Sequence, residues 1–371
     1  MNILLLSRAP LNYKAGIPCF VKSLYSTMPE HNIVSISPSF SLFPSWEAKF
    51  ITHSSVFKEY IFPSVARFGT IFFSPQYYFS GLLLSRKSHI IHYQHPDPIS
   101  ALLVLAIRLR HPHKKIVITW HAEIYQSYII FAPFLFLLDA CLFLFASKII
   151  YPSHAHQKSS ILYKLSFIKH KSAVIPIASL VPANISFDRL FTSKQIRVLS
   201  IGRLVSYKGY DYAIRAFKRL PNSYIYNIIG SGPLYSKLNK LIHQLGLSKR
   251  VTISTDLDDD TKFSYLRNSD IFLFPSISQS EAFGLSQLEA MHFSLPVINT
   301  FLQNGVNELA SEDIALTVLP RSAELISDAL IYMGSSQVRS NYSSKSRKRA
   351  MLYTVDSIVS KYLKLLASLY K

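Results

Sequence analysis

Two glutamates flank a single glycine just after an expected strand at residues 271–274. Glu281 would precede the helix that follows, and Glu289 would lie inside it, with Gly284 between them. Backbone amides at a helix start favour anions and the oxygens of phosphates or sugars. One carboxylate could then accept hydrogen bonds from the hydroxyls of a sugar, and the other from a ribose diol. The alternative is a capping carboxylate and an exposed helix glutamate, because so short a motif often arises by chance.

Two basic residues follow another expected strand, at residues 197–201. Gly202 lets the chain turn at the end of the strand, and Arg203 and Lys208 precede Gly209, which opens a helix. An arginine fork and a lysine point charge at such a position suit a diphosphate. A surface loop with solvated charges is an equally good explanation for this segment alone.

A glycine pair, Gly230 and Gly232, follows the next expected strand, at residues 224–229. Such a pair is typical of a turn that binds a phosphate or a base, and also of a turn in which glycine serves only the backbone conformation. In doubly wound sheets ligands bind at the carboxyl ends of the strands, which is where these three segments lie.

Short apolar runs alternate with segments of helical spacing through both halves of the chain. This alternation predicts an α/β protein whose parallel sheets carry helices on both faces. A polar stretch at residues 179–194 separates two such sets, which predicts two doubly wound, Rossmann-like domains. We expect a first domain over 1–180, a second over 195–350, and a helix over 351–371 that packs back towards the first domain. The expected strands are 3–6, 33–37, 89–93, 116–120, 149–151 and 173–176 in the first half, and 197–201, 224–229, 251–254, 271–274, 297–300 and 316–319 in the second.

The composition narrows the class of protein. The chain has 371 residues, a net charge of +19 and 49% hydrophobic residues, which excludes a disordered polycation. Two cysteines, Cys19 and Cys141, are too few for a disulfide-stapled module. No nucleic-acid-binding motif is found, so an anionic membrane surface is the expected partner and nucleic acid is not. The first 190 residues are the more basic half.

The longest apolar stretch, Tyr128–Ala146, contains Asp139 and Pro133. A bilayer span needs about 20 apolar residues, so a buried or membrane-facing helix is the better interpretation. The apolar start of the chain, Met1–Arg8, predicts a buried strand, not a signal peptide. We therefore expect a cytoplasmic protein, peripheral at the inner face of the cytoplasmic membrane. The basic segment Arg339–Arg349 predicts a solvated helix face and loop.

Taken in order, these segments resemble one family, the retaining nucleotide-sugar glycosyltransferases of family 4, which have the GT-B fold. Within that family they look most like bacterial enzymes of cell-surface polysaccharide and O-antigen synthesis. The resemblance is dense from about residue 198 to 320 and looser before it. The segments that carry it are Gly202-Arg203…Lys208-Gly209, Gly230-Ser-Gly232-Pro233, Phe274-Pro275-Ser276, Glu281-Ala-Phe-Gly284…Gln287-Leu-Glu289-Ala-Met and Pro296-Val-Ile, with Gly16 and Thr119-Trp-His121-Ala-Glu123 in the first half.

The resemblance implies an active site in the cleft between the two domains. Arg203 and Lys208 would bind the donor diphosphate and stabilise the leaving group, Glu281 would face the donor sugar, and His121 would reach the sugar or the acceptor. Glu289 would bind the ribose. The other implied donor-binding residues are Gly16, Gly202, Gly230, Gly232, Phe283, Gly284 and Leu285. His92, His95 and Glu123 are candidates for the acceptor side, although a packing role explains the first two equally well.

No metal or other cofactor is expected. The run Asp256–Asp260 contains the D-x-D spacing of metal-dependent glycosyltransferases, but here it precedes a helix, where acidic residues serve as caps. The family has a Gly-containing turn between its domains that this chain lacks, since Pro176 is followed by Ile-Ala-Ser. This departure bears on the local backbone path and the nucleotide contacts more than on the activity.

The sequence thus predicts a hexosyltransferase of the EC 2.4 class. It would move a hexose from GDP-mannose or a UDP-hexose to a lipid-linked or oligosaccharide acceptor, with retention, by a metal-independent front-face mechanism. The alternatives are a soluble-acceptor synthase of the sucrose or trehalose type and a non-catalytic sugar-nucleotide-binding protein.

Overall fold

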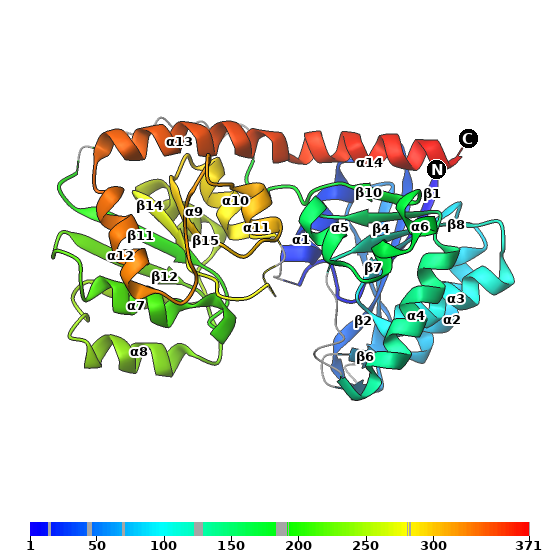
Figure 1. Ribbon diagram of the computed structural model, residues 1–371. Coiled ribbons are helices and arrows are strands. Elements are labelled where there is room, and N and C mark those ends of the chain that lie inside the picture. Colours follow the sequence, from blue (N-terminus) through cyan, green and yellow to red (C-terminus); the bar gives the residue numbers. More distant parts are fainter. Residues whose placement is uncertain are drawn as a thin grey trace. The chain divides into compact units, whose positions relative to one another are not determined.

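Two parallel sheets organise the chain, one in each of two units (Figure 1). Unit 1 comprises Met1–Leu180 and Val355–Lys371, and unit 2 comprises Val181–Thr354. The computed structural model describes residues 1–13, 16–42, 47–68, 71–121, 129–182, 191, 193–279, 281 and 283–370.

The sheet of unit 1 has eight strands in the order β10-β9-β8-β7-β1-β2-β4-β3, and only β3 runs antiparallel to its neighbour. A separate hairpin joins β5 to β6. The strands are β1 Asn2–Leu6, β2 Asn32–Leu42, β3 Lys49–Thr52, β4 Phe57–Ser64, β5 Ala66–Phe68, β6 Ile71–Phe73, β7 Ile90–His95, β8 Lys115–Trp120, β9 Lys148–Tyr151 and β10 Ser172–Val174.

The two faces of this sheet carry different helices. His92 of β7 contacts rings of α1 and α14, whereas Tyr93 shares a core with α2, α3 and α4. Successive strand side chains point to opposite faces, so α1 and α14 cover one face and α2 to α4 the other. The helices are α1 Gly16–Ser26, α2 Pro75–Ser85, α3 Pro98–Arg110, α4 Ala132–Phe145, α5 His154–Ser159, α6 Ser166–Lys169 and α14 Val355–Tyr370, with short 3-10 turns η2 Ile129–Phe131 and η3 Leu162–Lys164.

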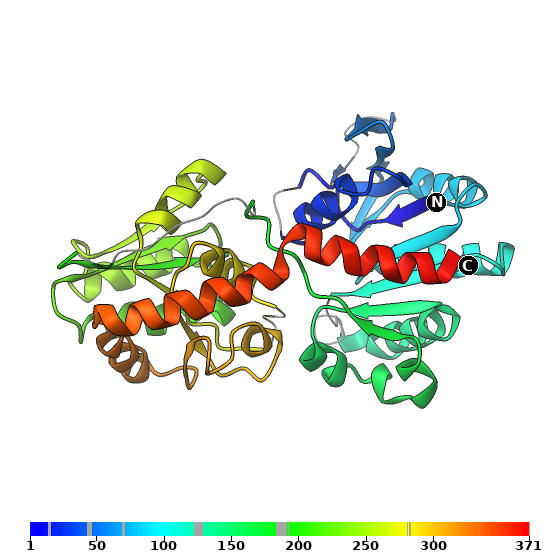
Figure 2. The same ribbon diagram turned by 90° about the horizontal axis from the view of Figure 1, so that it is seen from above.

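The C-terminal helix α14 belongs to unit 1, although it follows unit 2 in the chain. Its Tyr362 ring lies 6.5 Å from Phe20 of α1, and its Tyr370 ring lies 5.1 Å from His89. The backbone amide of Asn2 in turn donates to Nδ1 of His89 at 2.9 Å. The two ends of the chain therefore meet on unit 1 (Figure 2).

The sheet of unit 2 has six strands, all parallel, in the order β13-β12-β11-β14-β15-β16. The strand order reverses between β11 and β14, which makes the carboxyl ends of these two strands the point where a doubly wound sheet binds ligands. The strands are β11 Ile196–Ile201, β12 Tyr224–Ile229, β13 Val251–Ser254, β14 Ile271–Phe274, β15 Val297–Thr300 and β16 Leu316–Val318.

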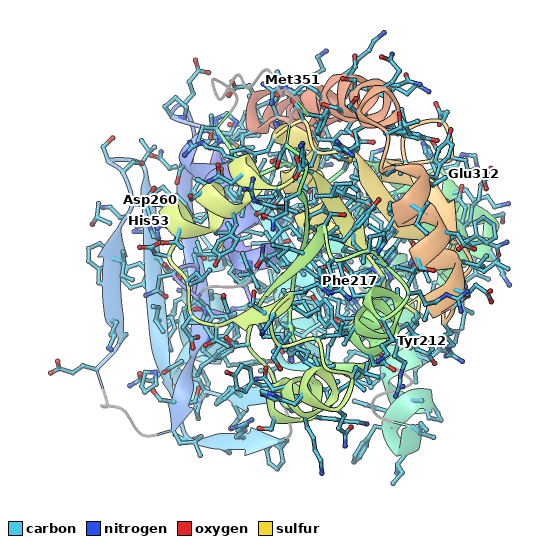
Figure 3. The ribbon with its side chains drawn as sticks, turned by 90° about the vertical axis from the view of Figure 1, so that its left-hand side faces the viewer. His53, Tyr212, Phe217, Asp260, Glu312 and Met351 are labelled. Carbon is cyan, nitrogen blue, oxygen red and sulfur yellow. The ribbon has the colours of Figure 1, made fainter. Side chains whose placement is uncertain are left out.

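Aromatic and aliphatic packing fixes the helices of unit 2 to this sheet. Phe217 of α7 stacks on Tyr226 of β12 with ring centroids 4.7 Å apart, and Tyr212 lies on the same helix (Figure 3). Asp258 caps α9 by accepting a hydrogen bond from the amide of Thr261, which confirms the capping role expected for the acidic run. The helices are η4 Ser206–Lys208, α7 Tyr210–Phe217, α8 Tyr235–Gln244, α9 Asp259–Asn268, α10 Leu285–His292, α11 Gly305–Leu309, α12 Ala323–Tyr332, α13 Ser336–Ala350 and η5 Met351–Tyr353.

The expected α/β class with two doubly wound sheets is confirmed. The expectation for Arg339–Arg349 is wrong in part, because this segment is the continuous helix α13 and not a loop. Arg339 is buried and donates to the carbonyls of Met333 and Gly334 at 2.8 Å each. By donating to the carbonyls just after α12, this buried guanidinium has a structural role.

Candidate functional site

The loops that follow β11 and β14 in unit 2 lie against each other. The amide of Ile277 donates to the carbonyl of Tyr207 at 2.8 Å. Gly209 has φ +66°, and a Cβ atom there would lie 2.1 Å from the carbonyl oxygen of Pro275. Only glycine fits this contact, which brings the residues after the two strands together.

The loop after β12 joins the same cluster. The amide of Leu204 donates to the carbonyl of Ser231 at 2.9 Å, and the amide of Gly202 to that of Ile229 at 2.9 Å. A Cβ atom on Gly230 would lie 1.9 Å from the carbonyl oxygen of Gly202, and one on Gly232 2.6 Å from that of Leu204. The glycines that the sequence singled out are therefore required for close contact between two loops.

Lys208 and Glu281 form an ion pair across the switch point of the sheet. Both side chains are largely buried, at 11% exposed for Lys208 and 13% for Glu281. The ammonium also lies 5.0 Å from the ring centroid of Phe274 and 5.8 Å from that of Tyr207. Aromatic faces attract a cation, so the ammonium is held by a carboxylate and by two rings at once.

Arg203 lies two residues after the end of β11, and it is exposed. Burial and the nearby Glu281 carboxylate raise the pKa of the Tyr207 hydroxyl, while the Arg203 guanidinium acts in the opposite direction. Both charges therefore act on this one ring. The structure thus gathers Arg203, Lys208 and Glu281, which the sequence predicted as separate candidates, around the loops after β11 and β14.

The backbone of Glu281 is fixed by a residue that the sequence did not suggest. The side-chain amide of Asn304 donates to the carbonyl of Glu281 at 2.5 Å, while its oxygen accepts from the amide of Val306 at 3.1 Å. Asn304 is thus both the cap of α11 and a support for the loop of Glu281. An Asn before Gly305 was the available signal, since asparagine is a preferred helix cap.

Glu289 lies inside α10 and contacts a second unpredicted residue, Lys262 of α9. The Lys262 ammonium lies 3.6 Å from Oε1 of Glu289 and 3.1 Å from Oδ1 of Asp259. Burial raises the pKa of the Glu289 carboxyl, and Lys262 partly offsets this effect. Lys262 thus favours the ionised form that a ribose partner needs.

The backbone of Phe283, Gly284 and Leu285 forms the start of α10, beside the loop of Glu281. Gly284 caps the helix with φ +82°, and the ring of Phe283 is buried 6.1 Å from that of Tyr353. Leu285 is the first residue of the helix. Because the side chain of Phe283 packs inward, a contact of this residue with a ligand would use its backbone.

In unit 1, His121 lies at the carboxyl end of β8 and is 3% exposed. Its Nε2 donates to the side-chain oxygen of Gln94 at 2.8 Å, which leaves Nδ1 as the acceptor nitrogen. Nδ1 has no hydrogen-bond partner among the residues described. Burial, with His156, His95 and His92 nearby, lowers the pKa of His121 to about 3, so the imidazole is neutral.

The structure places His92 in the core and not at an open edge, which favours the packing alternative over the acceptor role. His92 is fully buried and accepts at Nε2 from Thr119 at 2.7 Å and from Gln94 at 3.2 Å. Its Nδ1 donates to the hydroxyl of Tyr25. Both ring nitrogens of His92 therefore have hydrogen-bond partners within the core, and the side chain of Gln94 links His92 to His121.

His95 is also buried, and it supports the helix α4. Its Nε2 lies 3.2 Å from Oδ1 of Asp139, and its ring stacks on Trp120 with centroids 3.5 Å apart. This pair explains the acidic residue in the apolar stretch, because a buried carboxylate needs a partner. The structure thus favours the packing alternative for His95.

The remaining expectations concern Gly16, Glu123 and metal ions. Gly16 is the first residue of α1 and is exposed. Glu123 lies outside the described residues. Over the described part of the chain, no group of three His, Cys, Asp or Glu side chains is arranged to hold a metal ion. Among the same residues, no helix is long and apolar enough to cross a membrane.

Comparisons with known sequences match unit 2 most clearly. Residues 183–350 match the family model described as "Glycosyl transferases group 1". The chain is 26% identical over 289 residues to the O-antigen chain mannosyltransferase C of Escherichia coli, covering 76% of this chain and 75% of that protein. It is also 27% identical over 171 residues to an N-acetylgalactosaminyltransferase of Campylobacter jejuni that acts on a diphospho-undecaprenol, covering 46% of each chain.

Solved structures resemble the whole chain. Sucrose-phosphate synthase from Thermosynechococcus elongatus has a TM-score of 0.78 at 17% identity and covers 100% of this chain and 99% of its own. HepE from Anabaena, solved in complex with UDP, has a TM-score of 0.77 at 17% identity and covers 99% of this chain and 100% of its own. At this identity the likeness establishes the fold, which is that of GT-B glycosyltransferases.

Proposed function

We propose that this chain, a glycosyltransferase of the GT-B fold, moves a hexose from a nucleotide sugar to a lipid-linked saccharide of a bacterial surface polysaccharide, with retention. The observation that carries the proposal is the Lys208–Glu281 pair at the switch point of unit 2, with Arg203 beside it. Family 4, whose motifs the chain resembles, has this residue order.

The basic residues act on the leaving group. When the bond between the anomeric carbon and the diphosphate breaks, negative charge develops on the diphosphate oxygens. Lys208 and Arg203 stabilise that charge without a metal ion, Arg203 through its fork and Lys208 as a point charge. Lys208 is already desolvated and held over Phe274, which strengthens its interaction with an anion.

Glu281 and Glu289 position the donor. The Glu281 carboxylate accepts hydrogen bonds from the sugar hydroxyls, and Glu289 accepts them from the ribose diol. The new bond forms on the face from which the diphosphate leaves, and a diphosphate oxygen takes the proton of the acceptor hydroxyl. Glu281 is therefore a binding group and not a nucleophile.

His121 serves the sugar or the acceptor from unit 1. Its neutral ring has an acceptor nitrogen, Nδ1, that no described residue engages, and this nitrogen suits a hydroxyl donor. The Gln94 side chain fixes the ring and its tautomer. His121 thus contributes a hydrogen-bond acceptor and no charge.

The relatives favour a lipid-linked acceptor and a mannosyl or N-acetylhexosaminyl donor. The Escherichia coli protein is named an O-antigen mannosyltransferase, and the Campylobacter jejuni protein acts on a diphospho-undecaprenol saccharide. We therefore place GDP-mannose first among donors and UDP-hexoses second. A synthase of the sucrose or trehalose type shares the fold at 12–17% identity, which does not favour its acceptor.

A donor and acceptor screen tests this proposal. Binding of UDP-, GDP-, ADP- and TDP-sugars is measured by calorimetry, and transfer is measured to an undecaprenyl-linked saccharide and to glucose 6-phosphate, with and without EDTA. We expect one nucleotide class to bind, transfer to the lipid-linked acceptor alone, and no effect of EDTA. Binding of no sugar nucleotide would refute the donor role of unit 2, and loss of transfer in EDTA would refute the metal-free mechanism.

The same assay assigns the leaving-group role of Arg203. Arg203→Ala is expected to lower turnover by about 10²–10³, as for other donors to a developing anion. Arg219→Ala is the matched control, because Arg219 forms an exposed ion pair with Glu324 at 3.1 Å. Equal turnover in the two variants would exclude Arg203 from the reaction.

A further inference from the structure

The helix α4 of unit 1 is apolar on both its inner and its outer side. Leu135, Leu138 and Leu142 point into the core, whereas Phe134, Leu137 and Leu144 are exposed. Asp139 is its only charged residue, and it is buried against His95. The turn before the helix, Ile129–Phe131, is more exposed still, with Ile130 at 88%.

A helix that is apolar all round is normally buried. Here the described residues leave the outer side open. At 14 residues α4 is about 21 Å long, whereas a bilayer core is about 30 Å thick, so the helix does not span. A helix that does not span can lie in the plane of the membrane interface with its exposed apolar side chains among the lipids. Because α4 has no basic residue, the charge that attracts lipid must come from other elements of unit 1.

Neighbouring helices extend the apolar surface. Helix α3 packs between α2 and α4, and the three lie side by side on one face of the sheet (Figure 1). Phe79 and Leu83 of α2 and Leu109 of α3 are exposed. Exposed apolar side chains on adjacent helices mark an interaction surface.

Among the described residues of 71–180, the exposed charged side chains are all basic. Residues 71–180 contain eleven Lys and Arg and three carboxylates. Two of the carboxylates, Asp97 and Asp139, are buried at 4% exposed each, and the third lies outside the described residues. The exposed basic residues are Arg86, Lys87, Arg110, Lys115, Lys158, Lys164 and Lys169.

We propose that unit 1 docks on an anionic bilayer by inserting the outer side of α4 and the turn Ile129–Phe131 among the lipid headgroups and upper acyl chains. The basic residues of 71–180 then contact the lipid phosphates. This goes beyond the reaction proposed above and does not depend on its donor. It also differs from adsorption by charge alone, because part of the binding survives high salt.

Charge complementarity selects this partner over a second copy of the chain. A symmetric contact through α4 would place two basic surfaces against each other, with repulsion between them. An anionic bilayer accepts both the basic and the apolar side chains. An acidic protein is the remaining partner of suitable charge, and vesicles of pure lipid distinguish it.

A pair of charge-matched variants tests insertion. The full chain is sedimented with vesicles of phosphatidylglycerol and phosphatidylethanolamine, and with phosphatidylcholine vesicles, at low salt and at 0.5 M salt, which reduces the Debye length to about 4 Å. Ile130→Glu with Leu137→Glu is compared with Ile331→Glu and Tyr332→Glu, which replace exposed residues of α12 in unit 2. Both variants change the net charge by the same amount.

We expect the α4 variant to lose at least tenfold in partitioning to anionic vesicles and the α12 variant to lose less than twofold. Wild-type binding should fall in 0.5 M salt but remain measurable. Absence of vesicle binding by the wild type, or equal loss in both variants, overturns the proposal. Donor binding by each variant is measured in parallel, so that a misfolded protein and a failed membrane contact give different results.

A second measurement reports insertion directly. Ile130→Trp is mixed with vesicles that contain lipids brominated in the upper acyl chain, and Ile331→Trp serves as the control. Bromine is expected to quench the fluorescence of the Ile130→Trp variant more strongly than that of the control. Equal fluorescence with and without bromine places the introduced indole outside the acyl region and overturns insertion.

Discussion

At the scale of single residues, the ion pair of Lys208 and Glu281 has two opposing roles. The carboxylate is paired with the ammonium that a donor diphosphate would need. Glu281→Gln removes this competition, so we expect a nucleoside diphosphate to bind about fivefold more tightly, the equivalent of about 1 kcal/mol. The same change removes a hydrogen-bond acceptor for the sugar, so turnover should fall.

Calorimetry with UDP and GDP, set beside turnover of the sugar nucleotide, separates the two effects. Glu324→Gln is the control, because Glu324 takes part in an exposed ion pair with Arg219. Weaker diphosphate binding by Glu281→Gln would show that the carboxylate supports the phosphate site and does not compete for it.

The sequence indicated the position of a residue in the fold best where that residue lies next to a strand end. Arg203, Lys208 and Glu281 have this position and meet around the loops after β11 and β14. Lys262 and Asn304 lie elsewhere in the sequence and contact Glu289 and Glu281 only through the fold. No local pattern in one sequence reports such contacts between distant residues.

At the scale of elements, the contact between η4–α7 and the loop after β14 depends on Gly209. Gly209→Ala introduces an unfavourable φ, at about 1–2 kcal/mol, and a clash with the carbonyl of Pro275. Gly246→Ala is the matched control, since Gly246 has φ +69° and no atom within 4 Å of an added Cβ. We expect Gly209→Ala to destabilise unit 2 by about 1–3 kcal/mol more than Gly246→Ala.

Urea unfolding of both variants measures this difference, and nucleotide binding reports whether the loop has moved. Equal loss of stability would mean that the backbone relaxes around the new methyl group. It would also mean that the close approach of the two loops is not needed to hold Lys208 beside Glu281.

The elements of unit 2 were predicted more fully than those of unit 1. All six of its strands are short apolar or β-branched runs that alternate with helices, and each was expected, although β13 and β16 are only partly buried. In unit 1 the strands β3 to β6 were missed. β3 is mostly exposed and antiparallel, and β5 and β6 have only three residues each, too few to give a recognisable strand pattern. The strand β4 alternates buried and accessible residues only as far as Tyr60, and its last four residues, which include Pro63, are all buried, so it shows no single period.

At the scale of the whole molecule, each unit has candidate residues next to the carboxyl ends of its parallel strands. The sequence predicted both sheets because the alternation of strand and helix is a property of the chain itself. It did not predict which histidines of unit 1 are buried. His92 and His121 occupy neighbouring strands, and only the network through Gln94 shows that the first is structural.

That network makes the stability of the chain depend on pH. Burial lowers the pKa of His92 and of His121 to about 3 and that of His156 to about 4, from an unfolded value of 6.5. Below pH 6.5 the unfolded chain binds protons that the folded chain does not, so stability falls as the pH falls. Between pH 6.5 and 5 each histidine should lower the free energy of unfolding by about 1–2 kcal/mol.

Urea midpoints of the full chain at pH 7.5, 6.5, 5.5 and 5.0 measure the effect. This window is chosen because burial raises the pKa of Asp97 and of Glu289, which adds stability at lower pH and opposes the histidines there. His92→Gln keeps a side chain that can bond to Thr119 and Tyr25 and removes one titrating group, so it should flatten the profile. His113 is exposed, so His113→Gln should leave the dependence of stability on pH the same as in the wild type. A wild-type profile that is flat from pH 7.5 to 5.0 would mean that these rings are protonated inside the fold, and His121 would then act on its substrate as a cation.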